Sequence, residues 1–391
     1  MKIAHFGTFD VDNYGDLLFP HIIEWRMDSV EFIHISPSKN IPKFYDALKS
    51  YTSEVLQYAK YDGVIIGGGN IFHLRDCPIK EYFDIERLAI PSIIIGAANL
   101  AAKKKVPLLL NGPSIRKFDF GYLEKVLIKK ILLFSSYSSF RDDFSFDISL
   151  KINPDVTSFI PDTAFDISRM WPKNSFNITS TKSPNYIVVH VNERYGGCIS
   201  DTAKSIDNIA SKYEDAEIRF LPIGPCHGDI DYMIAIANKI KSRYQLIDEL
   251  SLREFASQIA NSKAYFGSSM HGFITSLSYG VPGLLIINAK PLEKFIGLLS
   301  MLEAPKYVIC SSWAVAADFS NLTWLMPEQV RLKIFNKLDQ HWEKVIKILD
   351  SMPSRSKSKL DVLLFSLWYP LTLFSQMEAN FRKKILKLRF I

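Results

Sequence analysis

His271 is the residue of this chain whose setting points most directly to chemistry. It follows Gly267–Ser269, a run of small residues between the apolar tract Lys263–Phe266 and a helix that the pattern predicts over Phe273–Tyr279. The first N–H groups of a helix have no partner inside it, so this arrangement suits an anion. A histidine can change its protonation state near neutral pH. The pattern therefore indicates an anionic substrate held beside a proton donor.

Two other segments combine polar residues with glycine where strands are expected to end. Asn13–Asp16 stands directly before a predicted helix, and its residue types fit either a capped loop or a direct substrate contact. Gly67–Asn70 follows the predicted strand end at Asp62–Ile66, where three glycines would let the backbone approach a ligand and present N–H groups. A plain tight turn is the alternative. The spacing is neither that of a P-loop nor that of a dinucleotide fingerprint.

Charged side chains follow three further predicted strands. Arg141 suits bidentate recognition of a carboxylate or phosphate, or else an ion pair with a neighbouring aspartate that caps a helix. Asp162 is either a turn residue or a carboxylate facing the site. Arg194 precedes two glycines at another strand end. Among the other histidines, His73 and His227 fall in predicted loops that could line a cleft.

Short apolar strands alternate with amphipathic helices, which predicts parallel sheets with helical crossovers. The expected strands are Lys2–Phe6, Phe32–Ile35, Gly63–Ile66, Pro107–Asn111, Ser136–Phe140, Tyr186–Asn192, Glu217–Pro222, Lys263–Phe266 and Gly283–Asn288. The expected helices include Leu17–Trp25, Lys43–Tyr58, Pro91–Lys104, Asp201–Tyr213 and Ile230–Ser242.

The two halves of this series look alike and predict two Rossmann-like α/β domains that face a cleft. At 391 residues the chain has the length of two domains. We expect a first domain over 1–167, a polar, proline-containing linker over 168–184, a second domain over 185–349 and a C-terminal helical tail over 350–391. In such sheets, ligands bind beyond the carboxyl ends of the strands.

The composition favours a small anionic ligand or an anionic lipid surface over nucleic acid, because the net charge is only +6 and there is no dense basic stripe with aromatics. The four scattered cysteines indicate a reducing compartment and argue against a structural zinc site. We therefore expect no metal. The N-terminus resembles a first strand rather than a signal peptide, and no run is suited to span a bilayer. A cytoplasmic protein is predicted.

Taken in order, the clusters resemble those of the polysaccharide pyruvyl transferase family from about Phe6 to Phe295. The matching segments are Asn13–Asp16, Asp62 with Gly67–Gly69, Asn111–Pro113, Arg141 and Asp142 with Ser145, Asp162–Phe165, His271–Gly272 and Gly280–Pro282. The resemblance implies a GT-B-like fold. It also implies transfer of the enolpyruvyl unit of phosphoenolpyruvate to two hydroxyls of one sugar as a cyclic ketal, with neither metal nor nucleotide. The implied partners are phosphoenolpyruvate and a polysaccharide or lipid-linked acceptor.

The resemblance assigns roles to residues at the predicted cleft. The catalytic candidates are His271, Arg141, Asp16 and Asp162. The donor-binding candidates are Arg141, Gly67, Gly68, Gly69, Asn70, Ser268, Ser269, Arg194, Lys290 and Lys294, where either lysine could match the family position. The acceptor-binding candidates are Asn13, Asp16 and His73. The family usually has an arginine two residues before the motif histidine, and this chain has Ser269 there.

Two other functions fit part of the pattern. A GT-B glycosyltransferase that uses a nucleotide sugar would have the same architecture, and Ser269 alone would suit a binding protein without activity. Beyond the resemblance, residues 360–374 are densely apolar between basic flanks. They suit either an interfacial segment on anionic lipid at the inner face of the membrane or a helix that packs back on the first domain.

Overall fold

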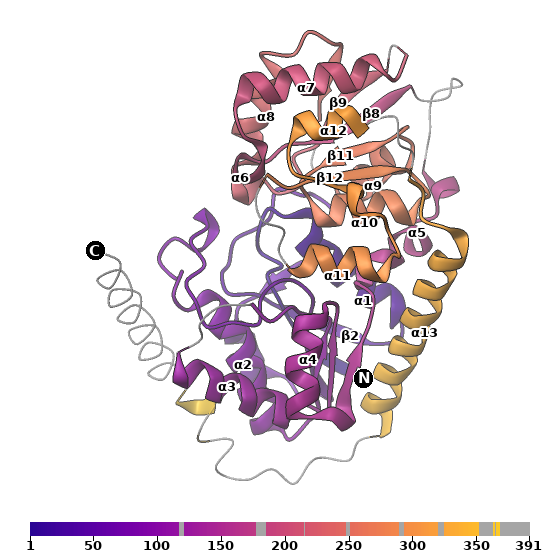
Figure 1. Ribbon diagram of the computed structural model, residues 1–391. Helices are drawn as coiled ribbons and strands as arrows, with labels where there is room; N and C mark the ends of the chain where they lie inside the picture. The colour runs from indigo at the N-terminus through magenta and orange to yellow at the C-terminus, as the bar shows by residue number, and fades with distance from the viewer. Residues whose placement is uncertain are drawn as a thin grey trace, which may run out of the picture.

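The computed structural model describes residues 1–116, 121–176, 185–214, 216–247, 251–288, 293–319, 324–351, 363 and 365–367. Two parallel sheets with helices around them form the two halves of the molecule, one above the other in Figure 1. The GT-B-like α/β arrangement expected from the sequence is therefore confirmed at the level of topology.

The first sheet has seven parallel strands in the order β3-β2-β1-β4-β5-β6-β7. Its strands are β1 Lys2–Phe6, β2 Glu31–Ile35, β3 Ser50–Tyr51, β4 Gly63–Ile66, β5 Leu108–Asn111, β6 Tyr137–Phe140 and β7 Thr157–Phe159. The central strands β4 and β5 are fully buried, which is why they appear in the sequence as continuous apolar runs.

The second sheet repeats this pattern with six parallel strands in the order β10-β9-β8-β11-β12-β13. Its strands are β8 Tyr186–His190, β9 Glu217–Phe220, β10 Tyr244–Leu246, β11 Tyr265–Gly267, β12 Gly283–Ile286 and β13 Ile309–Cys310. The strand order reverses between β1 and β4 in one sheet and between β8 and β11 in the other. These switch points are the places where ligands bind in open α/β sheets.

Helices connect the strands and cover the sheets. The α-helices are α1 Tyr14–Arg26, α2 Ala89–Lys104, α3 Tyr122–Phe134, α4 Asp143–Ile152, α5 Ile167–Met170, α6 Glu193–Gly196, α7 Ile199–Ser211, α8 Asp229–Ala237, α9 Leu252–Ala260, α10 Met270–Ser278, α11 Glu293–Met301, α12 Trp313–Phe319 and α13 Glu328–Ser351. Short 3-10 turns are η1 Ser53–Tyr58, η2 Lys80–Tyr82, η3 Pro154–Val156, η4 Thr163–Asp166, η5 Lys173–Ser175, η6 Pro225–His227 and η7 Lys306–Val308.

The helix expected over Lys43–Tyr58 is wrong. This segment contains the edge strand β3 and the 3-10 turn η1. The backbone oxygen of Tyr51 accepts a hydrogen bond from the N–H of Ser36, which extends the sheet beyond β2. Helix propensity is a weak preference, and pairing with an existing sheet edge overrides it here.

One of the buried hydrophobic clusters spans the two halves, and each half also has a cluster of its own. Tyr14 of α1 packs among residues of the second half, with its ring 6.0 Å from that of Phe255, and both belong to the same buried cluster. Its hydroxyl lies 3.1 Å from the Thr275 hydroxyl of α10. This shared core fixes the N-terminus of α1 against α10.

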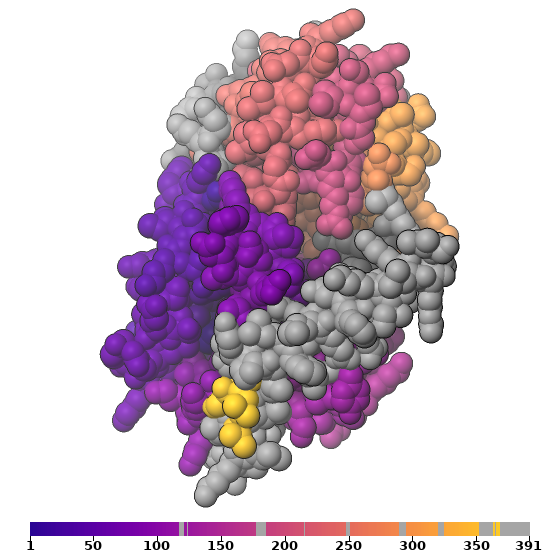
Figure 2. All heavy atoms as spheres, turned by 90° about the vertical axis from the view of Figure 1, so that its left-hand side faces the viewer, coloured from indigo at the N-terminus to yellow at the C-terminus, as the bar shows by residue number. Residues whose placement is uncertain are grey.

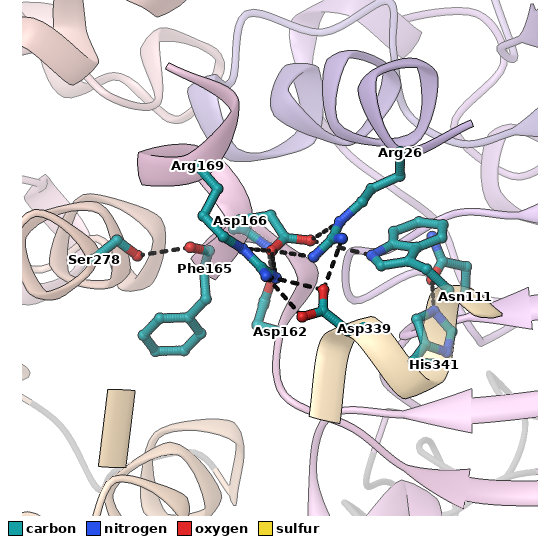
Figure 3. A network of polar contacts seen from close by, with 11 residues as sticks. Arg26, Asn111, Asp162, Phe165, Asp166, Arg169, Ser278, Asp339 and His341 are labelled. Atoms are coloured by element: carbon teal, nitrogen blue, oxygen red, sulfur yellow. Dashed lines mark hydrogen bonds and ion pairs between the residues drawn. The ribbon is translucent and has the colours of Figure 1, made fainter. Parts of the chain in front are cut away.

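The long helix α13 returns from the second half to the first. Figure 3 shows the buried Asp166 accepting hydrogen bonds from Arg26 and Arg169, while Asp339 of α13 pairs with the same two arginines. Trp342 of α13 adds a third donor to Asp166. Because a buried carboxylate is stable only when it is paired and hydrogen-bonded, this network ties α1, α5 and α13 together at the crossover.

The described part of the C-terminal tail lies on the first half. Phe365 is fully buried and meets Phe134 of α3 with ring centroids 5.2 Å apart. Ser366 donates to the side chain of Asn99 of α2. The other residues of the expected tail beyond Ser351, except Leu363 and Leu367, lie outside the described residues, as do 177–184 of the expected linker.

Candidate functional site

The candidate residues sit where the strand topology places ligands. Asp16 and Gly69 follow β1 and β4 at the switch point of the first sheet, and His271 follows β11 at that of the second. Arg141 directly follows β6, and Asp162 comes shortly after β7. The carboxyl ends of the two sheets therefore bring these side chains to one region.

Arg141, Asp162 and His271 form the centre of the site. Nη1 of Arg141 donates to Oδ2 of Asp162 at 2.5 Å, and Nε of the same guanidinium donates to the Ser114 hydroxyl at 3.2 Å. Nε2 of His271 lies 3.4 Å from Nη1 of Arg141 and 3.6 Å from Oδ2 of Asp162. The predicted pairing of Arg141 with a neighbouring aspartate is replaced by this longer-range pair.

Asp162 is a buried anion. Burial opposes its ionisation, but Arg141 and His271 outweigh that cost and hold the pKa of the carboxyl well below its usual range. Its other oxygen, Oδ1, caps η4 by accepting the N–H of Ala164 at 2.9 Å. The interpretation of Asp162 as a turn residue is therefore confirmed, and its role as a site carboxylate stays a prediction.

Asp16 is a second carboxylate in the same region, and its pKa is raised where that of Asp162 is lowered. Burial raises its pKa, although the positive charges of His271, His227 and Arg141 partly counter the effect. A β-carbon on Gly69, which has φ +84°, would lie only 3.2 Å from Oδ1 of Asp16. A carboxyl group with a raised pKa next to a histidine and an arginine can exchange a proton with a substrate hydroxyl.

Gly15 allows His271 to reach the first half. A β-carbon at this position would lie 1.8 Å from Nδ1 of the His271 ring, so any larger residue would displace the imidazole. The ring of Phe19 meets that of His271 edge-on with centroids 5.6 Å apart. The start of α1 thus fixes the position of a histidine that belongs to the other half of the molecule.

Ser269 has a structural role at the start of α10. Its hydroxyl caps α10 by accepting the N–H of Gly272 at 3.3 Å. The neighbouring Ser268 is buried, and among the described residues its hydroxyl has no hydrogen-bond partner. The side chain of Ser269 is therefore engaged at the helix start, and the donor-binding role of Ser268 stays a prediction.

The structure gives some of the other predicted residues a structural role and leaves the predicted ligand contacts of the rest untested. Asn13 caps α1 through bonds from Gly15 and Asp16, as its residue type indicates. Gly67 and Gly68 are needed for internal packing, because β-carbons there would lie 2.2 Å from the ring of His5 and 2.3 Å from that of Phe19. Their role towards a donor stays a prediction, as does that of the exposed Asn70.

His73 and Arg194 are not part of the central cluster. His73 is buried, accepts the N–H of Arg75 on Nδ1, and has its pKa lowered to about 3 by burial and by two arginines. Arg194 is exposed on α6 with its guanidinium over the ring of Tyr195. Lys290 lies outside the described residues, and Lys294 is in α11, where its side chain is not described.

A small cavity adjoins the central ion pair. It has a volume of about 10 Å³ and is lined by Arg141, Asp162, Met270, Ile274, Leu298 and Met301. Its walls come from the ends of the first sheet, from α10 and from α11. One end of the cavity is therefore charged, and the remainder is apolar.

A comparison of the chain with known protein families matches the part of the sequence that holds these side chains. The family described as polysaccharide pyruvyl transferase matches residues 13–290, which include all the central side chains. The chain belongs to the polysaccharide pyruvyl transferase family. The resemblance noted in the sequence is confirmed. No curated protein matches the chain in sequence.

Solved structures with the same fold have low sequence identity to this chain. The UDP-GlcNAc 2-epimerase of Methanocaldococcus jannaschii, with UDP-GlcNAc and UDP, has a TM-score of 0.54 at 14% identity over 87% of this chain and 100% of its own. The corresponding values are 0.53, 12%, 91% and 100% for S. aureus MnaA with UDP, and 0.52, 12%, 90% and 100% for Anabaena Alr3699/HepE with UDP. These similarities establish the fold alone.

Several residues of the candidate site were not predicted. Ser114, which holds Arg141, gives no signal beyond lying after a strand, and Gly15 was taken as a turn glycine rather than as the contact surface of His271. His227 was expected in a loop that could line the cleft, and its charge partly counters the effect of burial on the pKa of Asp16. Within the described residues, no group of three or more His, Cys, Asp or Glu side chains could hold a metal ion, and no helix could cross a membrane.

Proposed function

We propose that this protein transfers the pyruvyl group of phosphoenolpyruvate to two hydroxyls of one sugar in a surface polysaccharide or its lipid-linked precursor, and so forms a ketal. The observation that carries the proposal is the contact of His271 with both Arg141 and Asp162, next to the half-buried Asp16. The site thus combines a cation for an anionic donor with two groups that can transfer protons.

Arg141 is the residue that we assign to the donor. A guanidinium has five N–H donors, and Asp162 and Ser114 engage two of its nitrogens. These bonds fix its plane and leave other N–H groups for a carboxylate or phosphate. The adjoining cavity has apolar walls and room for about one water-sized group, so the donor would bind largely outside it, at the exposed side of the guanidinium.

The proposed reaction begins with proton transfer from His271 to the methylene carbon C3 of the donor, which makes C2 electrophilic. The first sugar hydroxyl adds to C2 and gives its proton to Asp16. The bond between C2 and the phosphate oxygen breaks, and inorganic phosphate leaves towards Arg141. The second hydroxyl then adds to C2 and gives its proton to the neutral His271, which closes the ketal ring, while the proton held by Asp16 leaves with the phosphate.

Binding of the donor can be tested by thermal unfolding. A ligand of the native state raises the melting temperature by mass action, so phosphoenolpyruvate should raise it and uridine diphosphate sugars should not. The structural relatives include proteins solved with UDP. Stabilisation by nucleotide sugars without any effect of phosphoenolpyruvate would favour the glycosyltransferase alternative.

Replacing His271 tests the chemistry. We expect His271→Ala to lower phosphoenolpyruvate-dependent phosphate release by about 10²–10⁴-fold, because the variant lacks the group that protonates the donor. The melting temperature should change little, since the imidazole is partly exposed at a helix start. Near-normal turnover would show that the assigned proton transfer is wrong. Glu328→Ala, on the exposed start of α13, is the control.

A further inference from the structure

One turn of helix α13 carries three side chains that make polar contacts with the first half. They are Asp339, His341 and Trp342, of which the last two are buried and Asp339 is partly exposed. Figure 3 shows Asp339 and His341 on this helix beside the residues that they contact. Each buried polar group would be costly without its partner, so these contacts fix the place of the helix on the first half.

The first contact completes a ring of charges around Asp166. This carboxylate is fully buried and accepts hydrogen bonds from Nε and Nη2 of Arg26, both at 2.7 Å, and from Arg169. Asp339 lies 2.8 Å from Nη1 of Arg26 and accepts Nη1 of Arg169 at 2.9 Å. Trp342 donates to Asp166 at 3.1 Å. Two arginines thus share two aspartates, and loss of Asp339 would leave the buried carboxylate with two cations.

The turn η4 joins this ring to the reaction centre. It begins after its cap residue Asp162 and ends four residues later at Asp166. One oxygen of Asp162 accepts the N–H of Ala164 within the turn, and the other accepts Nη1 of Arg141. A movement of η4 would therefore be passed directly to the carboxylate that orients the guanidinium.

The same turn also contacts the helix that carries the motif histidine. The backbone oxygen of Phe165 in η4 accepts a hydrogen bond from the Ser278 hydroxyl at 3.1 Å. Ser278 is the last residue of α10, and His271 is the second. The position of η4 thus affects both sides of the contact between the arginine and the histidine.

His341 supports the other residue that holds Arg141. Its Nε2 lies 2.8 Å from Oδ1 of Asn111, and its Nδ1 lies 3.0 Å from the Tyr137 hydroxyl. Asn111 ends β5, three residues before Ser114, whose hydroxyl accepts Nε of Arg141. The two partners of the guanidinium are therefore both connected to the same turn of α13.

The bonding pattern gives His341 a fixed orientation and no role as a base. An amide oxygen only accepts, so Nε2 carries the proton and donates to Asn111, while Nδ1 accepts from Tyr137. Burial is the main cause that lowers the pKa of His341 to about 3, so the ring is neutral at physiological pH. Both ring nitrogens are used within the fold.

The halves also meet away from α13. The N–H of Tyr14 donates to the backbone oxygen of Ile223, and the N–H of Cys226 donates to that of Asp12. Figure 1 shows α13 along one side of both halves. Figure 2 views the other side, where purple segments of the first half border rose segments of the second. Loss of one contact of α13 should therefore shift the site without separating the halves.

We propose that α13 is a positioning element for the reaction and holds the guanidinium of Arg141 in place through both of its partners. One route runs from Asp339 through the Asp166 ring and η4 to Asp162. The other runs from His341 through the end of β5 to Ser114. The inference rests on the proposed function, in which the guanidinium binds the donor.

The first test is phosphate release at a temperature far below the melting temperature, where every variant is folded. We expect Asp339→Asn and His341→Phe to lower kcat about tenfold or more, because small displacements of a positioned group are costly. Asp339→Glu keeps the charge and should recover most of the rate. Asp350→Asn is the matched control, since it makes the same change at an exposed position of the same helix.

The second test does not depend on turnover. The imidazole signals of His271, assigned by their loss in His271→Ala, are recorded by nuclear magnetic resonance in the full chain. They should move in Asp339→Asn by more than the difference between the wild type and Asp350→Asn. A residue that only stabilises the fold would lower the melting temperature and leave both kcat and these signals unchanged.

In a protein that releases phosphate, the proposal requires both changes, and the absence of either overturns it. Asp339 is partly exposed, so its variant decides the question even where His341→Phe does not fold. If the wild type shows no release that depends on phosphoenolpyruvate, the proposed reaction fails. The positioning role then stands if the His271 signals move in Asp339→Asn, and it falls if they do not.

Discussion

At the scale of single residues, the orientation of the Arg141 guanidinium is fixed, which suits bidentate binding of a carboxylate or phosphate. Asp162 and Ser114 fix its guanidinium. Lysine keeps the charge but cannot reproduce the fork, so Arg141→Lys should raise the concentration of phosphoenolpyruvate needed for half-maximal rate by about tenfold or more. The measurement is a donor titration of phosphate release, with Arg219→Lys, away from the site, as the matched control. An unchanged donor dependence would make Arg141 a purely structural partner of Asp162.

Asp162 should also make stability depend on pH. Its folded-state pKa lies below the ordinary value of 3.8, so its contribution is fully present above about pH 4 and is lost as the pH falls through the folded-state pKa. Asp162→Asn leaves Arg141 without its buried partner and should cost about 3 kcal/mol of unfolding free energy at pH 7. Denaturant unfolding between pH 7 and pH 2 should show this difference shrinking towards acid, and a pH-independent difference would contradict the assignment.

At the scale of elements, the site depends on how closely α1 approaches α10. Gly15→Ala would improve helix propensity but place a methyl group within 1.8 Å of Nδ1 of His271. Because small displacements of a catalytic group are costly, we expect the rate of phosphate release to fall about 10²-fold with little change in melting temperature.

Gly96→Ala is the control for this variant. Its β-carbon would meet its nearest neighbour at 3.7 Å within α2, so it should leave activity unchanged. Equal activity of the two alanine variants would show that the contact between Gly15 and His271 does not position the imidazole.

At the scale of the whole molecule, the C-terminal tail bears on whether the protein contacts a membrane. Phe365 packs on the first half, in line with the packing alternative for residues 360–374. We propose that the basic residues after Asn380 contact anionic lipid. Co-sedimentation with anionic vesicles should then decrease with salt and when residues 381–391 are deleted. Equal recovery of both proteins in the supernatant would remove support for peripheral membrane contact.

The sequence by itself determined the alternation of buried strands and helices, and with it the fold class, because fully buried parallel strands require continuous apolar runs such as Gly63–Ile66. It also identified the motif histidine and its family. Only the tertiary structure decided the partners. Arg141 and His271 are 130 residues apart, and their contact depends on the shared core and on α13. Long-range packing also overrode the helical pattern of Lys43–Tyr58, because local propensities are weaker than pairing to a sheet edge.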